Sequence, residues 1–414
     1  MTDAISQEAG GEISNSFGSF GTQKHTVKFT TGLLDNHFEF AGRLSKIYSD
    51  GYVDRAFTNL RSYYLQGNYV DDNTIVKAIT FGGKEKTYQS WYGLDQSQLE
   101  EDRTQNPYTY DNETDNYWQD HYQLHWNESF NSNWSANIGL NYTSGKGYFE
   151  QFKDDRDAAD YGNLINDGSD VIVRRWLDND FYVVNASATY DKNGLEIISG
   201  ISYSDYTNDH YGEVIWGSDL ASGTAIRDRY YLSVSDKSDF SLFSKATLRI
   251  SEKLQSFLDL QSRYVNYKTT GLTSSRIPID IDAKFNFFNP KAGIYYKLNT
   301  SNEFYFSFAR AHREPTRTDY ENGNPYPEML DDFELGWKYK GKKSIYNINL
   351  YLMDYNDQLV LTGERDDVGY YIRANVGESY RAGIEFDGVF LSLIHISEPT
   401  RQAEISYAVF CLKK

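Results

Sequence analysis

The feature that most constrains this chain is a two-residue alternation of apolar and polar side chains, which returns many times before residue 390. One clear example has apolar residues at Trp134, Ala136, Ile138, Leu140 and Tyr142. The positions between them are Ser, Asn and Gly, and the alternation recurs over 182–190, 303–308 and 346–352. Because successive side chains of a β-strand point to opposite faces, this period predicts strands with one apolar and one polar face. The predicted fold class is all-β.

The length of these alternating segments separates two kinds of β protein. Strands of a soluble β-sandwich average about 5 to 6 residues, and their apolar face is a packed core. Many segments here continue for about 10 to 15 residues, which is typical of a transmembrane barrel whose apolar face contacts lipid. The sequence has no run of about 18 to 20 consecutive apolar residues, which a membrane helix requires. We therefore expect this chain to meet a membrane as strands.

The connections between the alternating segments are short and long in turn. Polar turns that suit the dihedral angles of tight hairpins occur at 35–36, 71–73, 131–133, 191–193, 251–253, 299–301 and 340–343. Longer insertions separate them at 93–116, 149–178, 208–228, 269–282, 312–330 and 356–369. Outer-membrane barrels are connected in this way, by short turns on one side and long loops on the other. The pattern predicts an antiparallel transmembrane β-barrel with about 16 strands between Gly11 and Phe390.

Composition and charge exclude several other classes of protein. The 414 residues include 41 Lys and Arg against 59 Asp and Glu, a net charge of −18, and 16% of them are aromatic. So many aromatic residues exclude an intrinsically disordered acidic chain. The negative charge removes the electrostatic basis for binding nucleic-acid phosphates, so no nucleic acid is predicted as a partner. A single Cys excludes a disulfide framework, and residues 1–10 lack the basic start and apolar run of a signal peptide.

No pattern for catalysis or metal binding emerges. The nucleophile-elbow, phosphate-loop and dinucleotide-binding motifs are absent, so the chain is predicted not to be an enzyme, and no cofactor is expected. His121 and His125 would converge on a helix, but they fall on an alternating strand. An acidic group at 154–160 lacks the glycine and the terminal glutamate of a calcium-binding loop. We predict no catalytic residue and no metal site.

The last two dozen residues differ in style from the rest. The string LSLIHISEPTR at 391–401 resembles the in-frame translation of one end of a common sequencing-library adapter, and ISYAVFCLKK at 405–414 resembles its other end. The residues between the two strings have the length of the adapter's index segment. We therefore expect residues 391–414, including His395 and Cys411, to be an adapter-derived artefact. The natural sequence is expected to end near Phe390.

Several motifs in a fixed order resemble one family. They are NPKAGI at 289–294, FSFARAHREPTR at 306–317, DFELG at 332–336, YLMDYNDQLV at 351–360, NVGESYRAGIE at 375–385 and, near the start, GSFGTQ at 18–23. These strings resemble the barrel of TonB-dependent outer-membrane receptors. The resemblance covers roughly residues 5–390, and its late cluster of motifs is the specific part.

The resemblance implies a barrel of about 22 strands, which an N-terminal plug fills and the TonB complex opens for import. On this basis residues 1–10 are expected to be a remnant of the plug–barrel junction. Residues 11–390 are expected to be a TonB-dependent receptor β-barrel fragment with about 16 of the 22 strands. An incomplete sheet has two unpaired edges, which hydrocarbon does not tolerate, so we expect this polypeptide alone not to transport.

Within the family, the late motifs look most like those of iron-siderophore receptors. The implied function is active import of a ferric siderophore or similar small ligand across the bacterial outer membrane. The implied partners are the TonB complex, membrane lipid and lipopolysaccharide, whose phosphates the acidic segments 97–116 and 154–170 could bind through divalent cations. The alternatives are a passive porin-like barrel and a carbohydrate-importing barrel of the same membrane.

Five residues are candidates for contacting such a ligand. His312, Arg313 and Arg317 follow one predicted strand and could bind an anionic ferric chelate. Arg373 lies near the end of another predicted strand, and Tyr326 could stack on the ligand. The alternative is that the arginines pair with acidic loop residues or line the lumen, and that the tyrosine packs within its loop or at the membrane boundary.

Overall fold

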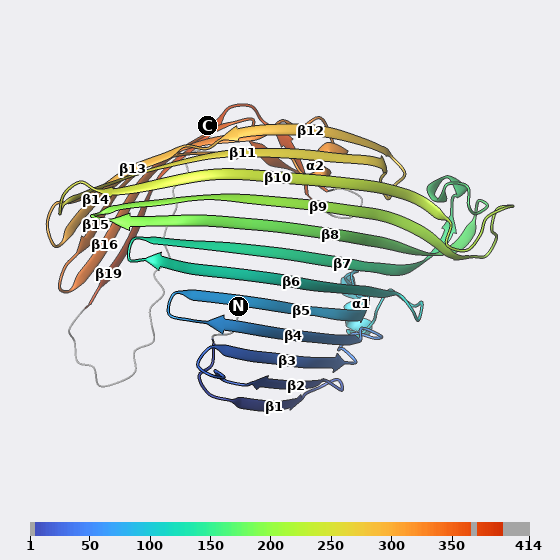
Figure 1. Cartoon of the computed structure of the whole chain (residues 1–414). Helices are drawn as coiled ribbons and strands as arrows, with labels where there is room; N and C mark the ends of the chain where they lie inside the picture. Colours follow the sequence, from blue (N-terminus) through green and yellow to red (C-terminus); the bar gives the residue numbers. More distant parts are fainter. Residues whose placement is uncertain (1–4, 366–370, 392–414) are drawn as a thin grey trace.

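A computed structural model describes residues 5–365 and 371–391, and it is built almost entirely from β-strands (Figure 1). Residues 1–4 and 392–414 lie outside the described part, so the predicted adapter-derived segment is described only at Leu391.

The strands occupy most of the chain. The first nine are β1 (Gly10–Phe17), β2 (Gln23–Thr30), β3 (Phe38–Ser49), β4 (Thr58–Val70), β5 (Thr74–Tyr88), β6 (Thr114–Asn131), β7 (Trp134–Arg156), β8 (Ser169–Lys192) and β9 (Leu195–Gly217). The others are β10 (Arg229–Arg249), β11 (Leu254–Leu272), β12 (Pro278–Phe288), β13 (Lys291–Lys297), β14 (Asn302–Arg313), β15 (Glu328–Lys340), β16 (Ser344–Asn356), β17 (Leu359–Arg365), β18 (Tyr371–Asn375) and β19 (Ser379–Phe390). Three short helical segments lie in connections: α1 (Gln96–Glu101), η1 (Ala158–Tyr161) and α2 (Arg317–Glu321).

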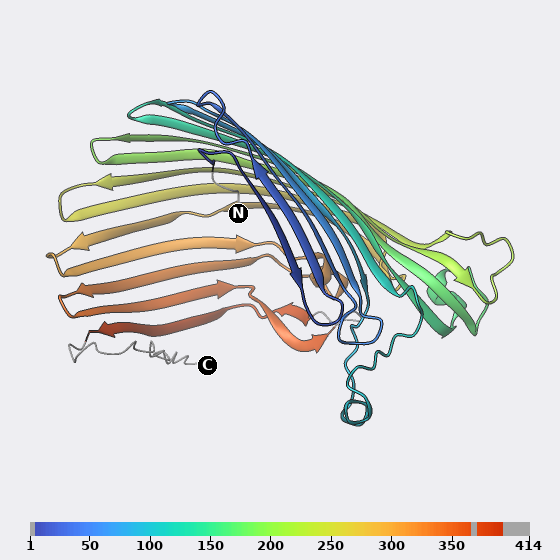
Figure 2. The ribbon, with the colours of Figure 1, turned by 90° about the horizontal axis from the view of Figure 1, so that it is seen from below.

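The strands form one antiparallel meander that curves into an open barrel wall (Figure 2). Each strand from β1 to β11 pairs with the next, and the ladder continues through β14, β15 and β16 to β19. Although the sheet has 17 strands, β12 and β13 both pair with β11 and lie end to end, so the chain crosses the wall 16 times. The predicted fold class and the predicted number of strands are therefore confirmed. Strands β17 and β18 form a separate hairpin.

The junction of β12 and β13 falls at Asn289 and Pro290. Proline has no N–H to donate to a ladder, which ends the regular pairing there. The wall is nevertheless continuous, because the N–H of Asn289 donates to the carbonyl of Gln261 at 2.8 Å and the carbonyl of Pro290 accepts from the N–H of Arg310 at 3.0 Å.

Short turns gather at one end of the wall and long connections at the other (Figure 1). The predicted tight turns all join neighbouring strands. In the turn between β8 and β9, for example, Asn193 and Gly194 have φ values of 53° and 79°, which these two residue types adopt with little strain. We call the two ends the turn end and the loop end.

The long connections are shorter than the sequence predicts. The insertion expected over 149–178 is strand as far as Arg156 and again from Ser169, so the connection is 157–168. Similarly, β9 continues to Gly217. The regular alternation is lost in these extensions because Val171, Val173 and Val214 are buried in an apolar cluster at the loop end, while the backbone ladder continues.

The two faces of the wall differ in chemistry. The apolar residues of one parity on β7 run from Trp134 to Tyr142, and on β8 their partners run from Tyr190 to Tyr182. The rings pair at both ends, with centroids 4.9 Å apart for Trp134–Tyr190 and 4.7 Å for Tyr142–Tyr182. The two aromatic levels are roughly 26 Å apart along a strand, close to the height of a lipid-facing band. We call this apolar face the outer face and its aromatic boundary near the loop end the loop-side girdle.

The opposite, polar face lines the lumen. Residues 5–9 lie inside the curve of the wall (Figure 2), where the N–H of Ser6 donates to the Glu39 carboxylate at 3.1 Å. Glu39 also accepts from Thr30, Gln66 and Asn68, and it shares the parity of the polar residues on its neighbours. We call this the inner face. No helix within the described residues is long and apolar enough to span a membrane.

Substitutions on the two faces of β7 are expected to have different costs. Ile138 lies midway between the two aromatic levels on the outer face, so Ile138→Arg should lower the free energy of unfolding by about 2–4 kcal/mol. Asn137→Arg places the same side chain on the inner face and should cost less than about 1 kcal/mol. Urea unfolding of both variants in lipid vesicles, followed by circular dichroism, measures the difference. Equal losses would contradict the assignment of the faces.

Candidate functional site

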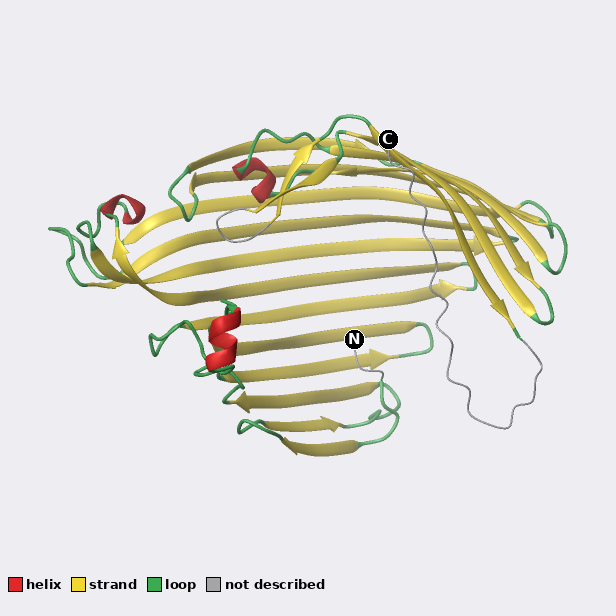
Figure 3. Cartoon of the chain, turned by 180° about the vertical axis from the view of Figure 1, so that it is seen from behind, coloured by secondary structure: helices red, strands yellow, loops and turns green. Residues whose placement is uncertain are grey.

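The connection between β14 and β15 folds against the inner face of the wall. This connection, residues 314–327, contains α2 (Figure 3). The helix begins where the N–H and the hydroxyl of Thr316 both donate to the Asp319 carboxylate, at 2.7 and 2.8 Å. From it, Arg317 donates to the hydroxyl of Ser233 on β10 at 3.0 Å, and the ring of Tyr320 lies 6.2 Å from that of Tyr267 on β11. The docked connection and the wall together form the surface that we describe as the candidate site.

An ionic network holds the start of this connection to β10 and β11. Lys237 donates to Glu314 at 2.7 Å, and Arg263 donates to both oxygens of the same carboxylate at 2.8 Å. Arg263 also donates to Asp239, at 2.8 Å from its Nε. Burial alone would raise the pKa of Glu314, but the hydrogen bonds from Arg263 and Lys237 outweigh it and lower the pKa to about 2. Glu314 is therefore ionised at every physiological pH.

A half-buried histidine lies beside the Arg317 contact. His210 is on the part of β9 beyond Asp205, which pairs with the girdle residue Tyr182. It is paired with Ser233, and its Nε2 lies 3.1 Å from the hydroxyl of Tyr231. Burial first, and then the positive charges of Arg317 and Arg175, lower the pKa of His210 to about 4. The imidazole is therefore neutral at physiological pH and presents one donor and one acceptor.

Aromatic rings surround these groups on the inner face. Tyr206 on β9 lies opposite Phe181 on β8, and the two rings pack edge-on with centroids 6.1 Å apart. The ammonium group of Lys237 lies 5.9 Å from the centre of the Tyr267 ring. We define the lumenal cluster as Tyr206, His210, Tyr231, Tyr267, Arg317 and Tyr320. Tyr231 and Tyr267 are buried, whereas Tyr206, Arg317 and Tyr320 are half-buried. A guanidinium beside ring faces on the inner face suits an anionic ligand with planar groups.

Four of the five predicted site residues meet where this connection touches the β17–β18 hairpin. Arg373 donates to Asp319 at 3.0 Å and to Thr316 at 3.1 Å, so it connects the hairpin to α2, which Arg317 begins. The backbone N–H of Tyr326 donates to the side chain of Asn375 on β18 at 2.8 Å.

Arg313 and His312 lie at the strand end that leads into the connection. Arg313 donates to Glu328 at 3.3 Å and to the carbonyl of Leu359 at 3.4 Å, which reaches the hairpin. His312 is directed elsewhere: it stacks on Phe287 with centroids 4.9 Å apart, and its Nδ1 lies 2.7 Å from the Asn289 side-chain oxygen.

Each arginine of this region has an acidic partner, as the alternative interpretation expected. Besides Arg313, Arg310 pairs with Asp331 at 2.6 Å and Arg317 pairs with Glu321 at 2.7 Å. Arg317 differs from Arg310 because it also reaches the inner wall. The Tyr326 side chain remains 64% exposed and is free to meet a ligand.

The sequence interpretation did not identify His210, because it placed 208–228 in an insertion. One signal could have found it: Tyr206, Asn208 and His210 continue the inner-face parity of Ser202 and Ser204. No three His, Cys, Asp or Glu residues within 5–365 and 371–391 are grouped closely enough to hold a metal ion.

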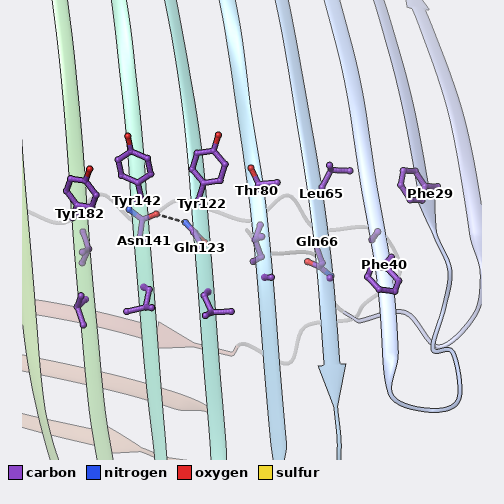
Figure 4. Close-up of a pocket in the computed structure, with 18 residues that line it drawn as sticks. Phe29, Phe40, Leu65, Gln66, Thr80, Tyr122, Gln123, Asn141, Tyr142 and Tyr182 are labelled. Atoms are coloured by element: carbon purple, nitrogen blue, oxygen red, sulfur yellow. Dashed lines mark hydrogen bonds between the residues drawn. The ribbon is translucent and has the colours of Figure 1, made fainter.

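A large hollow elsewhere on the wall belongs to the lipid-facing surface. Its volume is about 850 Å³, and Figure 4 shows Tyr122, Tyr142 and Tyr182 side by side across it. Their rings stack at 5.9 and 4.7 Å, and all three have outer-face parity. Phe29 and Phe40 extend the same apolar lining. A soluble ligand entering the lumen would not meet this hollow.

An open antiparallel wall with a lipid-facing band, a polar lumen and long connections at one end defines a transmembrane β-barrel. The family profile described as "TonB dependent receptor-like, beta-barrel" matches residues 45–398. The chain therefore belongs to this family, whose members are transport receptors of the bacterial outer membrane, and the predicted resemblance is confirmed.

Solved structures of the same fold come from several receptors. The siderophore receptor PiuA from Acinetobacter baumannii is 14% identical with a TM-score of 0.67, and the match covers 93% of this chain and 62% of that one. The ferric-catecholate import receptor Fiu from E. coli K12 is 13% identical with a TM-score of 0.62, over 93% and 62%. The copper transporter OprC is 12% identical with a TM-score of 0.67, over 94% and 60%. This chain thus spans about three fifths of their length, and no curated protein matches its sequence.

Removing the charge of Glu314 should loosen the docked connection. Hydrogen bonds to a charged group are worth about 1.5–3 kcal/mol, so Glu314→Gln should raise hydrogen exchange over 314–327 by about tenfold or more. Glu321→Gln changes the same kind of group in the same connection but removes only a pair within α2, and it should have a small effect. Mass spectrometry after exchange in detergent compares the variants.

The same network predicts a pH dependence. Because its pKa in the folded chain lies below its ordinary value, Glu314 stabilises docking above about pH 4.5, and this stabilisation is lost as the pH falls toward 2. Exchange rates that do not distinguish Glu314→Gln from Glu321→Gln at neutral pH would contradict the role of the network.

His210 should titrate unusually low, and Arg317 should contribute to the shift. The unfolded chain binds a proton near pH 6.5 that folded His210 does not accept until about pH 4, so acidification across this interval should lower the free energy of unfolding. Arg317→Gln should move the titration midpoint of His210 upward, though not to its ordinary value, because burial is the larger cause. Arg313→Gln is the matched control and should leave the midpoint unchanged. Histidine-selective NMR in detergent measures it, and a midpoint near 6.5 in the unaltered chain would refute the burial of this ring.

Proposed function

We propose that this chain forms the barrel wall of a bacterial outer-membrane receptor that imports a ferric siderophore. The observation that carries the proposal is the lumenal cluster, in which half-buried Arg317, Tyr206 and Tyr320 lie on the inner face at the loop end of a barrel of this family. Import is proposed for the full-length receptor, energised through the TonB complex.

The chemistry of the cluster supports an anionic chelate. Many ferric siderophore complexes are anionic and contain planar catecholate or hydroxamate groups, which suit a guanidinium and aromatic rings. The structural neighbours include siderophore receptors and a copper transporter, so the fold alone does not select the ligand.

The five predicted residues have distinct roles in this proposal. Arg317 contacts the ligand, and the exposed ring of Tyr326 meets it at the mouth of the lumen. Arg373 positions α2 through Asp319, and Arg313 fixes the hairpin through the Leu359 carbonyl. His312, held against Asn289, supports the strand end from which the connection departs.

The membrane partners follow from the two faces of the wall. The outer face would contact lipid and lipopolysaccharide, and residues 5–9 lie on the inner face near the turn end, where a plug preceding the barrel would join it. We propose that residues 1–10 belong to this junction and that TonB acts on the plug.

Replacing Arg317 should weaken ligand binding. The full chain folded in detergent is titrated with ferric catecholate, hydroxamate and citrate-type chelates, and quenching of its intrinsic fluorescence reports binding. We expect one class to bind and Arg317→Gln to weaken it by about tenfold or more, because a charge-assisted hydrogen bond is lost. Arg249→Gln makes the same change at the turn end of the inner face and should have little effect.

Two results would exclude this function. Absence of quenching by every ferric chelate, together with quenching by an oligosaccharide, would indicate the carbohydrate-importing alternative. Binding of a chelate with equal strength by Arg317→Gln and Arg249→Gln would place the ligand outside the lumenal cluster.

A further inference from the structure

A row of basic side chains crosses the outer face of β2, β3, β4 and β5. In the pairing register His25 lies opposite Lys46, Lys46 lies opposite Arg61, and Arg61 lies opposite Lys84. Side chains directly opposite one another on the same face are close neighbours. Lys46 and Arg61, in the middle of the row, therefore each have a basic neighbour on both sides. We call these four residues the basic row.

The row lies at the boundary between the apolar band and the loop end. On β2, β3 and β4, the next outer-face residue toward the turn end is apolar: Val27, Leu44 and Tyr63. The side chains of Val27 and Leu44 are 45% and 58% exposed, as expected for groups that contact lipid. The basic row is therefore at the level of the lipid headgroups nearest the loop end.

Among the described residues, the positive charges at the centre of the row form no ion pair. Lys46 and Arg61 are exposed, and neither makes a side-chain hydrogen bond or ion pair with any residue in the part of the chain that the structure describes. Lys84 lies over the ring of Trp118 at 5.6 Å, and His25 bonds to Asn15 at 2.6 Å. Opposed like charges destabilise a sheet, so an arrangement of this kind calls for an external anion.

The same cross-strand row reverses its sign farther along the wall. Beyond Trp118 it continues to Lys146, Asp178 and Asp209, and Lys146 pairs with Asp178 at 2.6 Å. In a chain with a net charge of −18, a run of unpaired basic groups is a local exception. The charge is thus concentrated on one sector of the outer face.

The basic row also borders a groove. The groove has a volume of about 690 Å³, and its lining contains all four basic residues together with Val27, Leu44, Tyr63, Trp118 and Asp120. Asp120 already accepts a hydrogen bond from the hydroxyl of Tyr63 at 2.8 Å. One side of the groove is therefore cationic and the other apolar, and both open toward the membrane.

We propose that this groove binds a phosphorylated glycolipid of the outer leaflet, with its phosphates on the basic row and its acyl chains against Val27 and Leu44. The proposal rests on the outer-membrane location proposed above. Clusters of basic residues at a membrane surface recognise anionic lipid headgroups. The apolar side of the groove is continuous with the lipid-facing band, which selects a lipid over free phosphate as the occupant.

The test compares two double variants of the full chain folded in detergent. Bis-phosphorylated lipid A is the probe, and native mass spectrometry measures its binding. Lys46→Gln with Arg61→Gln should weaken binding by about tenfold or more. The control, Lys268→Gln with Lys284→Gln, removes the same charge from the outer face of β11 and β12 beyond the girdle and should change binding less than about twofold. Circular dichroism should show equal strand content for all forms.

Further probes decide the nature of the occupant. Lipid A without its phosphates should bind weakly to the unaltered chain, and Lys46→Arg with Arg61→Lys should retain binding because the charges are kept. Equal affinity of both double variants, or of lipid A with and without phosphates, would overturn the proposal. Preference for phosphatidylglycerol over lipid A would also overturn it.

The outcome is distinguishable from that of the proposed function. Arg317→Gln should leave lipid A binding unchanged, and the basic-row variant should leave chelate quenching unchanged, because the two groups lie on opposite faces of the wall. A chain that binds lipid A through the basic row but no ferric chelate would retain this site and lose the proposed ligand. The converse result would remove only the lipid site.

Discussion

Backbone hydrogen bonding in hydrocarbon is the constraint on which the rest of this structure depends. A peptide group within a lipid bilayer has no water to bond, so each strand must find its partners in the neighbouring strands. The meander meets this requirement with antiparallel pairing for the strands between its two edge strands, β1 and β19. Even Pro290, which cannot donate, lies where its carbonyl still accepts from the next strand. A local defect in the ladder therefore does not interrupt the wall.

Pairing in this way assigns every side chain to one of two environments. Bulky apolar groups reach lipid, and polar groups reach the lumen, where charges can be buried together. Glu314 shows what the inner environment permits: its carboxylate is nearly enclosed, yet two cations donate three hydrogen bonds to it and offset the cost of burial. The connection that carries α2 can therefore dock on a rigid wall, and the lumenal cluster depends on that wall for its geometry.

Local sequence was sufficient to predict the strands and turns within the membrane. Alternation has a period that helices do not share, and residues such as Asn193 and Gly194 favour tight turns whatever surrounds them. The extensions of β7 and β9 were harder to predict, because apolar residues there, such as Val214, pack into a cluster at the loop end instead of following the lipid-facing alternation, even though the ladder continues to Arg156 and Gly217. His210 lies in one of these extensions and was missed for that reason.

The candidate site was only partly predictable because its contacts join distant segments. The residue types of Arg313, Arg317 and Arg373 indicated anion binding, but nothing local to Arg373 indicates that it bonds to Asp319, which is 54 positions away. That contact depends on the β17–β18 hairpin folding back on α2. Cross-strand register likewise depends on segments that are distant in the sequence. The basic row joins four strands, and each of its residues is unremarkable until the pairing places them side by side.

Two groups of basic residues in this chain illustrate different uses of positive charge. Inside the wall, Arg263 and Lys237 share the Glu314 carboxylate, so their charge is used within the protein to hold a connection in place. On the outer face, Lys46 and Arg61 are exposed and have no such acceptor among the described residues. In an acidic chain, acidic partners are abundant, so cations left without one point to an anion outside the polypeptide. The position of these two unpaired charges beside the apolar band is therefore the observation on which the proposed lipid site depends.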